Sequence, residues 1–135
     1  MTERYVPAWD TTIEGETLET EIAKVERFHL GQEDHGLFSV ELTFGGSGWG
    51  QGISPHSLDE YNSELKKRVG TAFGMDYIMA VVNRLGSPEQ AVGKQVVVYR
   101  SKINRMIVGF ATMSKDGKIG DPFFPQKLAD RHYPR

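Results

Sequence analysis

The chain of 135 residues contains no cysteine. This absence excludes a disulfide framework, a thiolate zinc site and a thiol nucleophile, and it is compatible with a reducing cytoplasm. Long apolar runs are missing too, since the longest, residues 106–113, is far short of the roughly 20 residues that span a bilayer. The first residues include Glu3 and no apolar segment, so they do not resemble a signal peptide. We therefore expect a soluble intracellular protein.

The chain has no excess of positive charge, because its formal net charge is −2. Binding to a long nucleic acid needs many Lys and Arg contacts to phosphates, so this class of partner is disfavoured. A small anionic ligand needs only a few local arginines and remains possible. The length predicts a single domain with its own core. We expect an irregular or disordered N-terminal arm (1–20), a single α+β ligand-binding domain (21–113) and a C-terminal turn and polar tail (114–135).

Two strands are predicted in the first half of that domain. Residues 21–30 have strand-like composition, and residues 31–36 form a loop with a glycine at each end. The segment 38–44 alternates apolar and polar residues, which is typical of a sheet with one face on the core and one face in water. We expect the two strands to pair antiparallel.

Two helices and two further strands follow. Ser57 and Glu60 form a capping-box pattern that predicts a helix over 58–69. Thr71 can cap a second helix that ends at Leu85, with Gly86 as a left-handed stop. Segments 95–100 and 106–113 have strand composition. The order β-β-α-α-β-β predicts an α+β fold, an antiparallel sheet interrupted by two consecutive helices.

The second helix has one continuous apolar arc when it is placed on a wheel of about 100° per residue. The predicted buried arc comprises Met75, Tyr77, Ile78, Val81, Val82 and Leu85. The opposite arc carries Phe73, Asp76, Ala80, Asn83 and Arg84. An aromatic ring beside an amide and a carboxylate suits a planar polar ligand, so Phe73, Asp76 and Asn83 are candidate binding residues. Ordinary surface variation also produces such a phenylalanine.

The segment 45–52 contains five glycines. Glycine permits positive φ and close backbone approach, so such a loop can offer amides to a phosphate or wrap around a neighbouring chain. Neither phosphate-loop fingerprint is present, because no Gly-Lys-Ser/Thr follows and no helix opens at the required distance. The alternative is a flexible or bulged connection anchored by Trp49.

Catalytic motifs are missing from the sequence. The four histidines fall on separate predicted elements with no ligand spacing, so we expect no metal and no cofactor. No serine lies in a nucleophile elbow or near a recognisable base and acid. We therefore expect a binding protein rather than an enzyme, with no catalytic residues.

Two arginines are candidate anion contacts. Arg100 ends the strand that contains Val96 and Val98 and lies on their side of the sheet, so its stem can cover apolar surface while its guanidinium faces outward. Such a group suits bidentate contact with phosphate or stacking on a purine. Arg27, near the end of the first strand, can act in the same way. Either arginine can equally be a solvated charge.

Three motifs resemble the small phage proteins of the Thoeris anti-defence family, first type, which sequester the cyclic ADP-ribose signal made by bacterial immune TIR enzymes. They are the text Phe-His-Leu-Gly-Gln-Glu-Asp-His-Gly at 28–36, the run Gly-Gly-Ser-Gly with Gln-Gly and Leu-Asp over 45–59, and the spacing of Phe73, Asn83 and Arg100. The likeness covers roughly residues 21–113. The chain departs from the family where Ser-Pro-His (54–56) replaces Gly-Gly-Tyr and where Trp49-Gly50 is inserted, so no contact of that loop is carried over.

The resemblance implies a site and a function. In the family, residues at the positions of Phe73 and Arg100 sandwich adenine, the one at Asn83 hydrogen-bonds the ligand, and an arginine of the first strand, best matched by Arg27, engages phosphate. It implies a homodimer whose pockets use both protomers, assembled into a hexamer in the host bacterial cytoplasm. Some relatives also hold cyclic oligonucleotides. We expect a protein that binds a cyclic nucleotide signal without degrading it.

Two other functions are compatible with the sequence. The chain can be a phage inhibitor or structural protein that binds another protein through the glycine-rich segment and Trp49. A cyclic nucleotide hydrolase is the third reading, although the sequence offers no base or metal for it.

Overall fold

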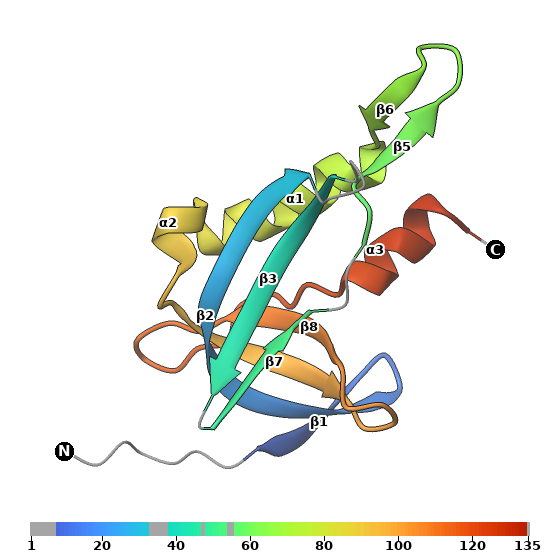
Figure 1. Cartoon of the computed structure of the whole chain (residues 1–135). Coiled ribbons are helices and arrows are strands. Elements are labelled where there is room, and N and C mark those ends of the chain that lie inside the picture. Colours follow the sequence, from blue (N-terminus) through green and yellow to red (C-terminus); the bar gives the residue numbers. More distant parts are fainter. Residues whose placement is uncertain (1–7, 33–37, 47, 54–55, 135) are drawn as a thin grey trace.

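A single long strand, β2 (Glu16–Gln32), runs through the centre of the main sheet. The computed structural model describes residues 8–32, 38–46, 48–53 and 56–134. One half of β2 pairs with β3 (Phe38–Gly46) and the other half pairs with β7 (Gln95–Ser101), all antiparallel. Figure 1 shows β2 as a curved strand that passes from one end of the molecule to the other. The sheet order is β4-β3-β2-β7-β8, and β1 also pairs with β2.

The remaining elements extend or cover this sheet. They are β1 (Trp9–Ile13), β4 (Trp49–Gly52), β5 (Asp59–Asn62), β6 (Lys67–Gly70), α1 (Ala72–Leu85), α2 (Pro88–Ala91), β8 (Ile107–Thr112) and α3 (Pro125–His132). The predicted α+β class with an antiparallel sheet is confirmed. None of the helices in the described part of the chain is long and apolar enough to cross a membrane.

The predicted irregular N-terminal arm is wrong for residues 9–20. β1 and the start of β2 form a hairpin whose turn has Glu14 and Gly15 at positive φ, 50° and 84°. Leu18 is buried together with Val97 and Tyr99 on the second face of the sheet, and Trp9 packs against them. Residues 1–7 of the predicted arm and 33–36 of the predicted loop lie outside the described residues. The hairpin thereby shields the apolar side chains on this second face of the sheet from solvent.

The predicted alternation is confirmed for residues 40–44, whereas Ser39, predicted to face water, is only 8% exposed. Val40, Leu42 and Phe44 are at most 6% exposed, whereas Glu41 is exposed. They pack with Val96 and with residues of α1 and α3 in the main core. The glycine-rich segment, for which the sequence allows a flexible or bulged connection, pairs as a β3–β4 hairpin.

Helix α1 begins and ends where the sequence predicts. The Thr71 hydroxyl accepts a hydrogen bond from the Gly74 amide at 2.9 Å, and Gly86 stops the helix at φ 81°. The predicted buried arc is correct for Tyr77, Val81 and Leu85, but Phe73 is also buried, at 3% exposed.

The remainder of the predicted arc is partly wrong, since Met75 is 59% exposed and Val82 is 37% exposed. The reason is the close approach of Gly74 to the Leu58 backbone, where any Cβ would overlap the Leu58 carbonyl. This contact fixes the rotation of α1 and turns Phe73 inward.

The predicted helix over 58–69 is wrong, because this segment forms the β5–β6 hairpin (Figure 1). The Asp59 carboxylate accepts three hydrogen bonds: from the Phe38 amide (3.2 Å), the Ser57 hydroxyl (3.2 Å) and the Arg68 guanidinium (2.9 Å). These tertiary bonds override the local capping pattern. The Arg68 hydrogen bond holds the pKa of Asp59 below its ordinary value of 3.8.

The predicted polar tail is also partly helical. Helix α3 begins at Pro125 and buries Leu128 against the main core. The short helix α2, which is not among the helices predicted from the sequence, begins with a capping box formed by Ser87 and Gln90. A proline at the first position suits a helix start, since its missing N–H has no partner there.

Replacing Asp59 with alanine should destabilise the protein. The substitution leaves the Phe38 amide without its acceptor and removes the carboxylate that pairs with Arg68, whose Nη2 keeps only the carbonyl oxygen of residue 59 at 3.1 Å. Such losses typically cost about 1–3 kcal/mol. Chemical denaturation should show this decrease in the free energy of unfolding. Glu60→Ala, at the next, exposed position of β5, should stay within about 0.5 kcal/mol of wild type. Equal stability of the two variants would contradict the role of Asp59.

Acid should weaken the protein through the same carboxylate. Because the pKa of Asp59 is lower in the folded state than its ordinary 3.8, its contribution is present above that value and is lost as pH falls through the folded-state pKa. Denaturation between pH 5 and about pH 2 should therefore show a shallower loss of stability for Asp59→Asn than for wild type. Parallel curves would refute the assignment.

Candidate functional site

Arg100 lies at the end of β7 on the same face as Val96 and Val98, as the sequence predicts. Its guanidinium does not face outward, however, because the residue is only 7% exposed. The Arg100 Cζ atom lies 4.6 Å from the centre of the Trp49 ring, and its Nε donates a hydrogen bond to Gln51 Oε1 at 3.3 Å. Arg100 is predicted to present its cation outward, but in the structure that cation is buried and lies over the Trp49 indole.

Two glutamates of β2 balance this charge. The register places Glu19 directly opposite Arg100, and the Arg100 Nη1 atom is 3.6 Å from Glu19 and 3.9 Å from Glu21. Glu19 is held by a bidentate ion pair with Arg105, at 3.0 and 3.2 Å. Within the described residues, nothing accepts a hydrogen bond from either terminal nitrogen of Arg100.

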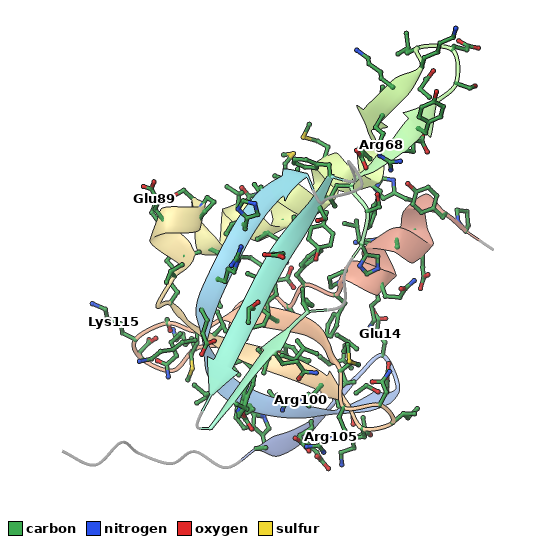
Figure 2. The ribbon with its side chains drawn as sticks, viewed as in Figure 1. Glu14, Arg68, Glu89, Arg100, Arg105 and Lys115 are labelled. Atoms are coloured by element: carbon green, nitrogen blue, oxygen red, sulfur yellow. The ribbon has the colours of Figure 1, made fainter. Side chains whose placement is uncertain are left out.

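These contacts define the Arg100 cluster, which consists of Glu19, Glu21, Trp49, Gln51, Arg100 and Arg105. Figure 2 shows Arg100 and Arg105 at one end of the molecule and Arg68 at the other. Sequence analysis missed Glu19, Glu21 and Gln51 as members. For Gln51, the sequence offered one signal, its two-residue spacing from Trp49, because residues two apart in a strand lie on the same face.

Phe73 belongs to a second group of rings. Its ring centre is 5.7 Å from that of His56 and 5.9 Å from those of Tyr77, His132 and Tyr133. The hydroxyl of Tyr77 is kept neutral, since burial raises its pKa well above the ordinary value. We call these five residues the Phe73 cluster. The prediction that Phe73 lies outside the buried arc is wrong.

Asp76 is next to this cluster. Its carboxylate is 2.7 Å from His132 Nε2, so α1 and α3 are joined here. An open hollow of about 410 Å³ lies between the two helices, lined by Asp76, Leu128, Arg131 and His132. His132 therefore contacts both Phe73 and Asp76. The lining of the hollow includes one carboxylate, one guanidinium and one imidazole.

The other candidates lie elsewhere. Asn83 is exposed on α1, and Arg27 is exposed on β2, where its Nε is 2.9 Å from the Glu41 carboxylate. Among the described residues, the hydrogen-bond, ion-pair and ring partners of Phe73, Arg100 and Arg27 do not overlap. α1 begins beside the β5–β6 hairpin, at the end of the molecule opposite to Arg100 (Figures 1 and 2). One chain therefore does not bring the predicted site residues together.

Searches of protein-family models, curated proteins and solved structures returned no match to this chain. In the described ranges, no group of three or more His, Asp or Glu side chains is arranged to hold a metal ion.

Removal of the Arg100 side chain should destabilise the fold. Arg100→Ala leaves Glu19 and Glu21 partly buried with less compensating charge, and we expect a loss of about 2 kcal/mol in the free energy of unfolding. Arg100→Lys keeps the charge and should lose less. Arg27→Ala removes an exposed pair and should change stability by at most about 1 kcal/mol. Denaturation curves of the three variants test this order, and a fully stable Arg100→Ala protein would contradict it.

Proposed function

We propose that this is a phage anti-defence protein that binds a cyclic nucleotide immune signal of the cyclic ADP-ribose type and sequesters it without degrading it, blocking Thoeris immunity in the host cytoplasm. The observation that carries the proposal is the state of Arg100. Its guanidinium lies over the Trp49 ring, its Nη1 atom is 3.6 Å from Glu19 and 3.9 Å from Glu21, and no described residue accepts a hydrogen bond from its terminal nitrogens. Such a group favours a ligand that offers phosphate oxygens and a flat base.

The separation of Phe73 and Arg100 supports a site formed by two copies of the chain. If both residues contact one ligand, as the family resemblance implies, each must come from a different protomer. We therefore propose a homodimer, assembled further into a hexamer, in which α1 of one protomer faces the Arg100 cluster of the other. Asn83, exposed on α1, is available to a ligand in that arrangement.

A base that stacks on Phe73 must displace one of the aromatic rings that cover the Phe73 side chain in this structure. His132 and Tyr133, at the end of α3, are the rings that α3 contributes, and Tyr133 is itself 54% exposed. Stacking is worth about 1–3 kcal/mol per base, and charge-assisted hydrogen bonds are worth about 1.5–3 kcal/mol each. One stack and several such bonds approach the roughly −12 kcal/mol of nanomolar affinity.

The test uses the filtered product of an activated bacterial immune TIR enzyme. The purified protein should deplete the product from solution and release it chemically unchanged on heating, as mass spectrometry would show. Asn83→Ala should bind at least about tenfold more weakly with an unchanged melting temperature, because Asn83 is exposed and outside the core. Gln95→Ala, an exposed amide on β7, is the matched control and should bind normally.

Two other results would contradict this proposal and favour a different function. Recovery of a hydrolysed product, with turnover of an excess of substrate, would identify an enzyme. Failure to deplete the TIR product, together with capture of a host protein independent of nucleotide, would favour a protein-binding inhibitor.

Co-expression of two variants tests the two-copy site. In a mixed dimer of Asn83→Ala and Arg100→Lys chains, one pocket carries both substitutions and the other carries neither. Binding should therefore return to roughly a quarter of the wild-type capacity, although each variant alone binds poorly. A site within one chain would show no such recovery.

A further inference from the structure

Strand β4 contributes two side chains to Arg100. Trp49 and Gln51 are two residues apart and therefore lie on the same face of the strand. The indole of Trp49 lies against the guanidinium, and the amide oxygen of Gln51 accepts the hydrogen bond from its Nε. Of the described residues, Gln51 is the only one that hydrogen-bonds this guanidinium.

The glycines of the segment make room for the indole. Gly46 is directly opposite Trp49 in the β3–β4 register, and a Cβ at Gly46 would overlap the indole ring. The turn between them contains Gly48 at φ 78°, a conformation that glycine adopts without strain. The glycine-rich run is thus a tight hairpin that lays the Trp49 ring beside β3.

Gln51 is fixed in turn by the segment that leads into β8. Its Nε2 donates hydrogen bonds to the Arg105 carbonyl at 3.2 Å and to the Met106 sulfur at 3.7 Å. This directs its amide oxygen toward Arg100. The guanidinium therefore has a ring over its face and an acceptor at its Nε. Its Nη1 atom also lies 3.6 Å from Glu19 and 3.9 Å from Glu21, and neither Nη1 nor Nη2 makes a hydrogen bond to a described residue.

We infer that Trp49 and Gln51 are positioning residues for ligand binding, which hold the Arg100 guanidinium in the plane that a phosphate or a purine requires. The inference rests on the proposed function. A long arginine side chain samples many rotamers, and a contact that fixes one of them before binding raises affinity by lowering the entropy lost in the complex. Trp49, which resembles an insertion in the sequence, then has a role in the site.

The experiment measures depletion of the TIR product by variants at Trp49. Trp49→Ala should bind at least tenfold more weakly, equivalent to about 1.4 kcal/mol. Trp49→Phe keeps a ring on the guanidinium and should recover most of the affinity. Gln51→Ala should also bind more weakly. Trp9→Phe, on the opposite face of the sheet, is the matched control and should bind as wild type.

Fluorescence gives a readout that a structural role would not change. In the Trp9→Phe protein the only indole is Trp49, and its emission should change when the product engages Arg100. Normal binding by Trp49→Ala, or an unchanged emission at saturating product, would overturn the inference while leaving the proposed function standing. Absence of binding by the wild-type protein would instead reject the proposed function, and the inference with it.

Discussion

The pairing of β2 on both of its edges is the constraint on which the rest of the structure depends. Its 17 residues pair with β1 and β3 along one edge and with β7 along the other. This arrangement joins the two halves of the sheet and creates two apolar faces. One face is covered by α1 and α3, and the other by the β1 hairpin and the segment after β8. The same register also places Glu19 opposite Arg100.

The parts of the fold that follow from local pattern could be predicted from the sequence. The alternation in β3 and the apolar run in β7 are set by which side chains face the core, so their period is visible in the chain. The caps of α1, Thr71 and Gly86, are also local, because their bonds reach only a few residues along the helix. The antiparallel α+β class followed from these elements.

The incorrect sequence predictions have a common physical cause, which is contacts between segments that are distant in the sequence. The segment 58–69 begins with a capping-box pattern, but Asp59 instead accepts hydrogen bonds from Phe38 and Arg68. The rotation of α1 depends on the approach of Gly74 to Leu58. Alternation placed Arg100 on the correct face, but its burial depends on Glu19 and Trp49, which are distant in sequence. A helical wheel or a strand pattern contains none of this information.

The β5–β6 hairpin projects from the end of the main sheet, and its two strands pair with each other rather than with that sheet (Figure 1). Tyr61 and Leu65 are about 60% exposed, so the hairpin buries little apolar surface of its own. Opening it therefore breaks a small part of the structure and leaves β2 and its partners intact. The chain thus has two levels of cooperativity. We therefore expect the backbone amides of this hairpin to exchange with solvent through a local opening, and those of β2 and β7 to exchange only when the whole domain unfolds.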